Sequence, residues 1–514
     1  MKTNLLALII VAIYMVTGCK NEKENSPNTY YINSELGNDA NVGTSPEKAW
    51  KTIEKINITG FHAGEKVLLQ GGQTFNGSIH ISSLRGTAKF PIEFNTYGKG
   101  KATILSGDSL AFLATDCQYI VLKNIIAKGS GRLKGNRTNG IEFFKVHNGT
   151  IDSVEASGYL WSGIQISGGE NIRITHANAH DNGFCGINVD SGEKEYGEDG
   201  SKYKTLRNVY VGHCIADNNP GCPEVKDNHS GSGILLGGVV NGLVEFCEAM
   251  NNGWDMPREG NGPVGIWAYM SDSIIIQHCY AHHNKTSLKG KDGGGFDFDG
   301  GITNSILQYN FSAFNEGAGY GIFQYAGATE WSNNIARYNI SYNDGSKNSQ
   351  AGILMWCDPI ALPMKKFHAY NNTIVNNFKY GVNFEPGVYK DFLFENNIFL
   401  VTPETDKFIG GDFKLATFQR NAFWAIGNES KGLYQPQVIL DKSAIIADPN
   451  LNLPTIEDIL KIDMNDVSTI QFFKLNQNSV CLKSGNVISA NGGRDFWGKE
   501  ISSEAKPNIG ADGE

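Results

Sequence analysis

The sequence predicts an all-β fold, a single-stranded, right-handed parallel β-helix in which short strands wind into a solenoid. The prediction rests on two short phrases that alternate along the middle of the chain. The composition agrees with it, because 61 glycines and only 15 prolines among 514 residues suit a chain that turns often and regularly. The formal net charge of −9 offers no basic surface, so no nucleic-acid partner is expected.

The first phrase is a glycine followed by an aliphatic or aromatic residue and then by alternation. Its copies begin at Gly140, Gly163, Gly186, Gly233, Gly265, Gly295, Gly321, Gly352 and Gly381. The intervals are 23 to 32 residues, apart from one of 47, and such periods are typical of solenoids. The right hand follows the general bias of parallel crossovers. A β-propeller is the alternative, but its blades need about 40–50 residues each.

The second phrase is rich in asparagine and lies between copies of the first, as in "HCIADNN" at His213. The second residue of each copy is expected to stack on that of the next copy, which gives one column: Cys214, Cys247, Cys279, Asn310, Asn339 and Asn371. Buried thiols behave as small hydrophobes, and stacked amides bond to the coils above and below. These three cysteines are therefore expected to be reduced. A disulfide between Cys185 and Cys222 is the one pairing that the sequence leaves open. No CxxC pair supports a zinc site.

The chain begins with a targeting segment. Lys2 precedes an apolar run at residues 5–16, which is too short for the ~20 residues that span a bilayer. Residues 1–18 are therefore expected to be a signal peptide. The sequence "VTGC" resembles a bacterial lipobox, which implies cleavage before Cys19 and lipidation of its thiol; an ordinary secretory signal is the alternative. The lipid would be the only anchor of the chain in the outer membrane, and residues 19–29 would form a tether. The folded part would face either the periplasm or the outside of the cell.

Several segments carry a family resemblance. Residues 30–57, the stretches "AGEKVLLQGGQTFNGSIHI" and "PIEFNTYGKGKATILSG", and the tail "GGRDFWGKEISSEAKPNIGADG" resemble a large group of secreted β-helix proteins. These are pectate-lyase-like glycoside hydrolases and polysaccharide lyases, many of them lipoproteins of Bacteroidetes-type bacteria. The resemblance implies an N-terminal cap at 30–60, a β-helix at 61–400 and C-terminal coils and a cap at 401–514. It implies a monomer that acts on a cell-wall-type polysaccharide or oligosaccharide, but two chemistries share this scaffold.

The stretch "GFDFD" at residues 295–299 carries the candidate catalytic groups. Alternate side chains of a strand point to opposite faces, so Phe296 and Phe298 are expected inside, and Asp297 and Asp299 outside. Residues two apart lie about 6.6 Å from each other at their backbones, near the carboxyl spacing of inverting glycosidases, and like charges so close raise one pKa. We therefore expect Asp297 and Asp299 to be the acid–base pair. Asp292 and Glu316 are the first substitutes for a member of this pair.

The outward positions of the first phrase form two expected columns. The first column is Glu142, Gln165, Asn188, Leu235, Trp267, Asp297, Phe323, Leu354 and Asn383. The second column is Phe144, Ser167, Asp190, Gly237, Tyr269, Asp299, Tyr325, Trp356 and Glu385. The residues expected to bind substrate are Trp267, Tyr269, Phe323, Tyr325, Trp356, Glu385, Asp190, His282, His283 and Arg258. Exposed aromatics in one patch are typical of a binding surface, although long loops covering this face would make them core residues.

Other interpretations of the three aspartates stay open. Calcium is possible, since the stretch half resembles the β-helix calcium nonapeptide, but Phe296 stands where that motif has glycine. An ordinary turn is a further possibility. A lyase would need a base and cations for a uronate, and Arg258, Lys285, Lys289 and Lys291 lie in nearby loops. A non-catalytic glycan-binding lipoprotein is the third class of function. A hydrolase that needs no cofactor fits the acidic and aromatic columns best.

Overall fold

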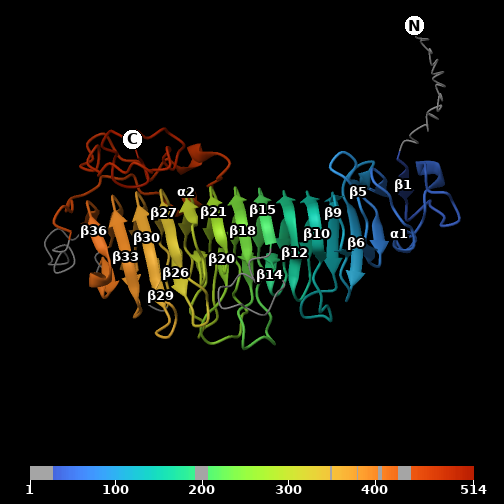
Figure 1. The fold of residues 1–514 in the computed structure, drawn as a ribbon, viewed down its shortest axis with the longest axis horizontal. Coiled ribbons are helices and arrows are strands. Elements are labelled where there is room, and N and C mark those ends of the chain that lie inside the picture. The colour runs from blue at the N-terminus through green and yellow to red at the C-terminus, as the bar shows by residue number, and fades with distance from the viewer. Residues whose placement is uncertain are drawn as a thin grey trace, which may run out of the picture.

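The computed structural model is an elongated solenoid of parallel strands, which confirms the predicted fold class (Figure 1). It describes residues 27–191, 206–347, 350–378, 380–402, 408–426 and 441–513. Cys19 and the residues expected to form a signal peptide lie outside these ranges. No helix within the described ranges is long and apolar enough to cross a membrane.

Each central coil contributes three strands, one to each of three parallel ladders, where the repeated phrases pointed to at least two. The first ladder is β4 (Ile79–Ser82), β7 (Phe112–Thr115), the first half of β10 (Ile141–Asp152), the first half of β12 (Ser162–Thr175), β14 (Cys185–Asp190), β17 (Ser232–Gly237), β20 (Val264–Tyr269), β23 (Gly294–Phe298), β26 (Tyr320–Gln324), β29 (Ala351–Cys357), β32 (Tyr380–Phe384) and β35 (Ile409–Gly411).

The second and third ladders complete the coils. The second is β1 (Thr29–Ile32), β2 (Lys66–Gln70), β5 (Ile92–Tyr97), β8 (Ile120–Lys123), the second halves of β10 and β12, β15 (Leu206–Gly212), β18 (Val239–Glu245), β21 (Asp272–Gln277), β24 (Ile306–Gln308), β27 (Ser332–Arg337), β30 (Met364–Tyr370), β33 (Tyr389–Glu395) and β36 (Thr417–Gln419). The third is β3 (Thr74–Asn76), β6 (Ala102–Gly107), β9 (Ile125–Gly129), β11 (Glu155–Ser157), β13 (Asn178–His180), β16 (Ile215–Asp217), β19 (Glu248–Met250), β22 (Tyr280–His282), β25 (Phe311–Ala313), β28 (Ile340–Tyr342), β31 (Thr373–Asn376), β34 (Ile398–Val401) and β37 (Ala422–Ala425).

Close stacking explains the repeated glycines. A Cβ atom placed on Gly233 would lie 2.4 Å from the carbonyl oxygen of Gly265, and one on Gly265 would lie 2.7 Å from that of Gly295. Real Cβ atoms do not approach oxygen so closely, so only glycine fits this column. The column continues through Gly319, because a Cβ atom on Gly295 would lie 3.0 Å from the Gly319 carbonyl oxygen. Gly321, which opens the phrase in the sequence, lies two residues further along the chain than Gly319.

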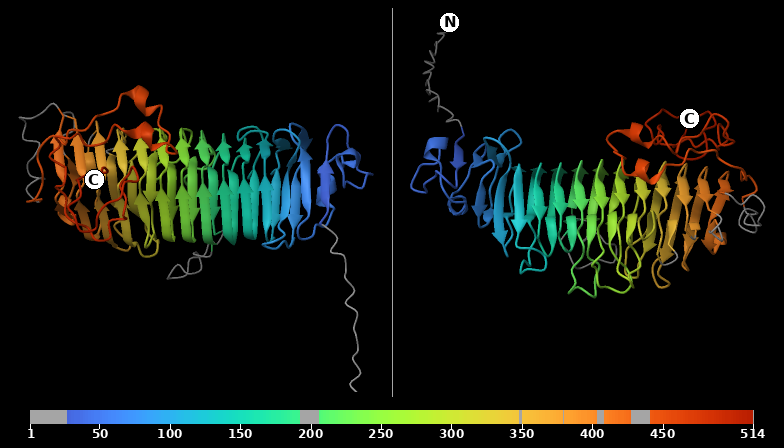
Figure 2. Two further views of the ribbon diagram at one scale, coloured as in Figure 1. Left: turned by 90° about the horizontal axis from the view of Figure 1, so that it is seen from above. Right: turned by 180° about the vertical axis from the view of Figure 1, so that it is seen from behind.

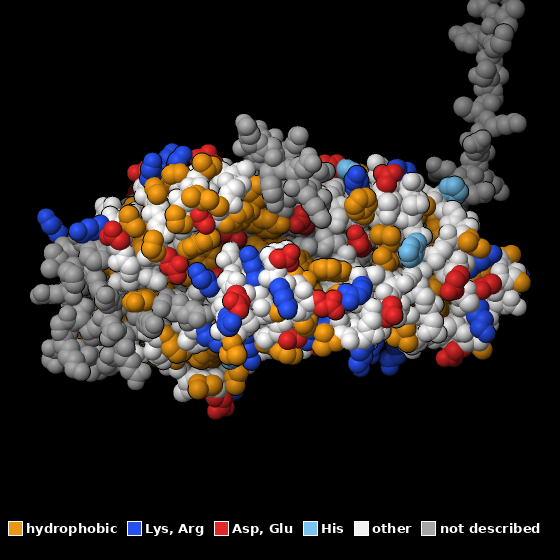
Figure 3. Space-filling model, turned by 90° about the horizontal axis from the view of Figure 1, so that it is seen from below, with side chains coloured by type: hydrophobic (Ala, Val, Ile, Leu, Met, Phe, Trp, Pro, Cys, Tyr) orange, Lys and Arg blue, Asp and Glu red, His pale blue; other side chains and the backbone are white. Residues whose placement is uncertain are grey.

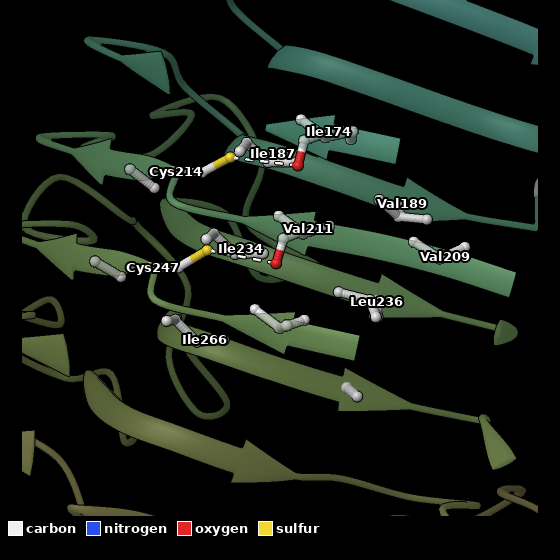
Figure 4. Packing of buried hydrophobic residues seen from close by; sticks show 14 of the residues in the cluster. Ile174, Ile187, Val189, Val209, Val211, Cys214, Ile234, Leu236, Cys247 and Ile266 are labelled. Atoms are coloured by element: carbon white, nitrogen blue, oxygen red, sulfur yellow. Dashed lines mark hydrogen bonds between the residues drawn. The ribbon is translucent and has the colours of Figure 1, made fainter. Parts of the chain in front are cut away.

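Two polar columns line the corners of the solenoid. Between the third and first ladders, buried amides stack in the order Asn182, Asn219, Asn252, Asn284 and Asn315, ending at Asp344. Between the second and third ladders the column is Cys214, Cys247, Cys279, Asn310, Asn339, Asn372, Asn397 and Asn421, ending at Asp441. Figure 4 shows Cys214 and Cys247 at equivalent places in successive coils, each pointing into the core.

The predicted cysteine state is confirmed, and one amide was misplaced. All eight cysteines of the described ranges are buried and free, including Cys185 and Cys222. Asn372, not Asn371, continues the column, since its Oδ1 accepts from the Asn339 side chain at 3.0 Å. Asn371 takes a left-handed conformation instead and donates to the Asn508 carbonyl oxygen. The sequence "YNN" offers two amides, and only the second aligns with the preceding coil.

Replacing Asp344 by asparagine is expected to stabilise the protein at neutral pH but not in acid. The carboxyl is fully buried, accepts from Asn315 and Ser341, and burial raises its pKa to about 6. A folded pKa above the unfolded value means that folding favours the protonated form, so stability is lost as pH rises from about 4 to about 6. The gain should be about 3 kcal/mol at pH 7 and near zero at pH 4. Urea unfolding at both pH values measures it, with Asp227→Asn at an exposed position as control; equal gains at the two pH values would refute the argument.

The ends of the solenoid are built differently from each other. At the N-terminal end, a 3-10 helix (Pro46–Lys48) contacts β1 and α1 (Glu54–Asn57) contacts β4; Trp50 and Ile53 in this segment are buried. At the other end, a 3-10 helix (Phe413–Leu415) precedes the last strands. In the C-terminal segment, α2 (Ile456–Ile459) and a 3-10 helix (Val467–Ile470) form.

Residues 441–513 are more than an end cap. They fold back along the solenoid and lie against its side (Figures 1 and 2). The outward face of the third ladder is apolar from β22 onward, with Phe311 and Ile340 fully buried, and Phe473 and Ile509 of the returning segment pack into the same cluster. An apolar sheet face must be covered, so the chain returns over this ladder and leaves the first ladder to the site described next.

Candidate active site

The strand β23 has the predicted alternation. Phe296 and Phe298 are 1% and 0% exposed within the core, and Asp297 and Asp299 lie on the opposite side, where they line a cavity. Asp297 pairs in register with Trp267 of the preceding coil, as expected. The columns of outward residues are therefore correct from Glu142 to Asp297.

The columns are wrong in the coil that follows Asp297, and they are correct again in the next two coils, where Leu354 and Asn383 continue the first column. In the coil directly after Asp297, Gly321 pairs with Asp297, so Phe323 takes the place beside Asp299 that was expected for Tyr325. Trp356 follows Phe323 in the second column, and Tyr325 lies beyond the end of β26. The cause is Tyr320, which faces the core, stacks on Phe296 at 5.3 Å, and places its hydroxyl 2.8 Å from the Asn310 carbonyl oxygen. Sequence periodicity does not anticipate a tyrosine at an inward position.

The cavity has two connected sections. The larger has a volume of about 330 Å³ and a narrower extension holds about 30 Å³. Asn261, Asp292 and Asp299 line both sections. The remaining residues of the larger section include Asn228, His229, Arg258, Trp267, Tyr269, Asp297 and Tyr325, and those of the extension include Lys291, Phe323, Gln350, Trp356 and Glu385. Figure 3 shows hydrophobic side chains gathered in the middle of the lower face, with charged side chains beside them.

The aromatic residues of the two columns are only partly covered by loops. Some of them are therefore core residues, and others can form a binding surface. Trp267 and Phe323 are only 4% and 7% exposed, whereas Tyr269, Tyr325 and Trp356 are half-buried and border the cavity. The Trp267 indole donates to Ser232 at 3.2 Å. The loops that bury some of these residues also shape the walls of the cavity.

Tyr269 is held in a fixed orientation across its column. Its ring stacks on Trp267 at 5.4 Å, and its hydroxyl donates to Asp190 at 2.8 Å. The ring passes directly over Gly237, where a Cβ atom would lie 2.6 Å from it. Asp190 therefore acts on the cavity through Tyr269.

Three carboxyl groups meet in the cavity. Asp292 accepts from the backbone N–H of Gly262 at 2.6 Å, and Asp299 from that of Gly300 at 2.7 Å. Asp297 is 3% exposed, and its Oδ1 has no hydrogen-bond partner. Asp297 is buried, Asp292 and Asp299 are half-buried, and the charges of Asp299 and Asp292 act on Asp297, so burial and like charge act together.

Burial is the main cause of the shifted pKa values. It raises the pKa of Asp292 to about 6, although the Gly262 hydrogen bond and Lys291 oppose the shift. Burial raises the pKa of Asp299 to about 7, and the charge of Asp292 adds to it. The pKa of Asp297 is raised well above its usual range by burial and by Asp299 and Asp292. Titratable groups tuned toward neutrality in one cavity are typical of catalytic sites.

Two loops bring Asp292 to the site. Backbone hydrogen bonds join the loop at residues 251–263 to the loop at residues 284–293. Lys291 N–H donates to the Gly260 carbonyl oxygen at 2.6 Å, and Gly293 N–H donates to the Pro263 carbonyl oxygen at 2.8 Å. The first of these loops is anchored by an ion pair of 2.7 Å between Arg132 and Asp255. Asp292 is therefore fixed by the coil before its own.

Three of the residues expected at the site lie elsewhere. Glu316 forms an ion pair of 2.6 Å with Lys347 and accepts from the Thr286 N–H at 2.8 Å, so its side chain is used outside the cavity. His282 ends β22 of the third ladder, where it contacts Glu248 at 3.0 Å, and His283 follows it. The histidines were assigned to the site from sequence proximity, but they lie on a different ladder of the coil.

Other residues were placed correctly or were missed. Arg258 and Glu385 line the cavity as expected. His229, Asn261 and Gln350 were not anticipated, and no periodic signal marks them because they belong to loops. His229 packs edge-on to Trp267 at 4.9 Å, and burial lowers its pKa to about 4, so it is neutral at pH 7.

The geometry of the site also bears on metal binding. Within the ranges that the structure describes, no group of three or more His, Cys, Asp or Glu side chains is arranged to hold a metal ion. The three aspartates lie close together but do not form such a group.

Comparisons with known proteins agree with the fold. No family model matches the chain. An 88-residue stretch, 16% of the chain, is 40% identical to a lacto-N-biosidase of Bifidobacterium longum subsp. longum but spans only 6% of that relative's length. The selenomethionine derivative of GH136 lacto-N-biosidase from Eubacterium ramulus matches 77% of this chain and 67% of its own, with a TM-score of 0.52 and 17% identity. The native form of that enzyme matches 82% and 67%, with a TM-score of 0.50 and 16% identity. The likeness to these solved structures is one of fold: the chain is a parallel β-helix of the kind they share.

Proposed function

We propose that the protein is a glycoside hydrolase whose acid–base pair is Asp299 and Asp292. One observation carries the proposal: these two carboxyl groups line both sections of a single aromatic-bordered cavity. Asp297, expected from the sequence as the partner of Asp299, lies deeper and does not border the narrow extension. Burial and the two neighbouring carboxyl groups raise the pKa of Asp297 well above its usual range.

The proposed mechanism follows from the order of the pKa values. Asp299, with a pKa of about 7, is protonated often enough near neutral pH to donate its proton to the leaving oxygen. Asp292, with a pKa of about 6, is largely ionised there and activates water or attacks the sugar carbon directly. If Asp292 activates water, it takes up a proton from that water, which balances the one that Asp299 released. If Asp292 attacks the sugar carbon, a water then cleaves the sugar–Asp292 ester and gives its proton back to Asp299.

Sugar rings are proposed to pack against the half-exposed aromatics Tyr269, Tyr325 and Trp356. Flat aromatic rings pack well against the apolar faces of sugars. Asn261 and Glu385 line the cavity and would form hydrogen bonds with sugar hydroxyl groups. The similar proteins are named lacto-N-biosidases. Glycans that end in lacto-N-biose should therefore be tested as substrates together with cell-wall polysaccharides.

Product analysis tests this proposal. The protein is incubated with the trial glycans, and new reducing ends and ultraviolet absorbance are followed. A hydrolase produces reducing ends without absorbance, and Asp299→Asn should abolish them. An unsaturated, absorbing product would overturn the hydrolase proposal, and the absence of any product across the panel would favour a non-catalytic glycan-binding protein.

A lyase is the second candidate, supported by two cations at the cavity. Arg258 and Lys291 border it beside Asp292, as a uronate substrate would require. Calcium would assist such a reaction by neutralising the uronate. If activity on a uronate polymer is lost with a chelator and restored by Ca²⁺, the aspartates are metal ligands and this candidate replaces the first.

Replacing Gly237 by alanine is expected to raise KM about tenfold with little change in kcat. The new methyl group would occupy the place of the Tyr269 ring and break its hydrogen bond to Asp190, so a sugar platform would tilt. Steady-state kinetics measure the effect. Gly60→Ala, where a Cβ atom meets nothing within 4 Å, is the control; an unchanged KM in the first variant would show that Tyr269 does not contact the substrate.

We also propose that the protein is anchored in the cell envelope by lipid on Cys19, on the basis of "VTGC" after a short apolar run. Replacing Cys19 by alanine removes the thiol to which the lipid would attach. The variant should move from the membrane fraction to the soluble fraction, measured by fractionation and immunoblotting. Membrane retention of the variant would contradict lipidation at this residue.

A further inference from the structure

A second cavity lies at the corner between the third and first ladders, on loops that follow successive strands of the third ladder. Its volume is about 290 Å³, and it shares no lining residue with the candidate active site. The lining residues used below are Arg132, Lys134, Asp181, Asn218, Pro220 and Trp254.

Trp254 is the central feature of this cavity because it is exposed and yet held in place. Its side chain is 46% exposed. Its indole N–H donates to the Asn218 side chain at 2.9 Å, and Asn218 in turn donates to Asp181 at 2.6 Å. The Arg132 guanidinium lies 5.6 Å from the ring centre and is itself fixed by the ion pair with Asp255. A large apolar ring on the surface gains nothing from solvent, so its rigid positioning needs another reason.

We propose that this cavity is a second glycan-binding site, in which a neutral sugar ring packs against Trp254. Asp181 offers an acceptor and Lys134 a donor for hydroxyl groups, and a rigid aromatic ring lowers the entropy cost of binding. The class of ligand rests on the proposed function. The same two loops serve both sites: residues 218–231 carry Asn218 here and His229 to the active site, and residues 251–263 carry Trp254 here and Asn261 there.

Fluorine NMR of the full chain labelled with 5-fluorotryptophan can test this site directly. The resonances of Trp254, Trp267 and Trp356 are assigned from the variants Trp254→Phe, Trp267→Phe and Trp356→Phe. The probes are lacto-N-biose, cellobiose, xylobiose and galactobiose. The Trp254 resonance should shift with a saturable curve for at least one probe, and Trp254→Ala should weaken binding at this site about tenfold, as monitored by calorimetry.

The outcomes separate this site from the active site. A shift of Trp254 that persists in Trp356→Ala supports the second site. If only Trp267 and Trp356 respond, the second site is wrong and the proposed function stands; if only Trp254 responds, the second site stands and the active-site assignment fails. If no tryptophan responds to any probe, the second site is refuted. Phe90→Ala, an exposed aromatic that lines neither cavity, should leave all shifts unchanged.

Discussion

Replacing Asp299 by asparagine is expected to lower kcat by about 10²–10⁴-fold, the range of general acid–base contributions. The amide keeps the shape of the carboxyl but cannot donate a proton to the leaving oxygen. The protein should remain folded and gain stability at neutral pH, because a buried ionisable group with a raised pKa has been removed. Initial rates and thermal unfolding of the same preparation measure both effects.

The companion variants discriminate between the two possible pairs. Asp292→Asn should lose activity as severely as Asp299→Asn, whereas Asp297→Asn should lose less than about tenfold, since Asp297 does not border the narrow extension of the cavity. If Asp297→Asn is the inactive variant and Asp292→Asn retains turnover, the pair expected from the sequence is correct and the structural assignment is wrong. Near-normal turnover in all three would show that the cluster is not catalytic.

The pH dependence of the wild-type enzyme follows from the same assignment. Activity should fall as pH rises through about 7, because Asp299 loses the proton it must donate, and it should fall below about pH 6, because Asp292 becomes protonated. A bell-shaped profile of kcat/KM with its maximum between these values is the expected result. In Asp292→Asn the acidic limb should vanish from the residual activity, and an unchanged profile would exclude Asp292 as the base.

The fold was predictable because its causes are local and repeated. The alternation around Phe296 and Phe298 marks a strand with one buried face, and the recurring glycine marks positions where a Cβ atom would lie 2.4–3.0 Å from a carbonyl oxygen of the next coil. Both the alternation and the glycine recur in the coils, so one misaligned coil does not prevent the prediction of the fold. The buried cysteines and amides of the corner column were predictable for the same reason.

The site was predictable only in part, because it depends on contacts between coils and loops. The register of β26 is decided by Tyr320, whose ring and hydroxyl find partners only in the assembled core. Asp292 enters the site because its loop pairs with residues 251–263, and Glu316 leaves it because Lys347 is within reach. None of these partners lies at a periodic spacing, so the sequence could place the aspartate cluster but not its complete surroundings.

Replacing Asn284 by alanine is expected to destabilise the protein by about 4 kcal/mol, the largest stability effect predicted for one residue here. Asn284 lies at the middle of a column of buried amides directly behind the candidate site. Its Nδ2 donates to the Ala249 carbonyl oxygen at 3.0 Å and to Asn315 at 2.9 Å, and its Oδ1 accepts from the Asn252 side chain at 2.9 Å. Alanine would leave several buried partners without hydrogen bonds, and each such group costs about 1–3 kcal/mol.

The measurement is urea unfolding at pH 7 together with hydrogen exchange of the coil that contains β22 and β23. Exchange should accelerate there first, because the lost amide no longer bridges the coils before and after it. Asn452→Ala, at an exposed position of the C-terminal segment, is the control and should change stability by less than about 0.5 kcal/mol. Asn284→Asp is the sharper comparison. It restores the acceptor oxygen but buries a second carboxyl in the column that already ends at Asp344, so its deficit should shrink in acid and grow at neutral pH, while that of Asn284→Ala stays constant. A pH-independent deficit in both variants would mean that packing, and not the hydrogen-bonded amide, holds the coils together at this point.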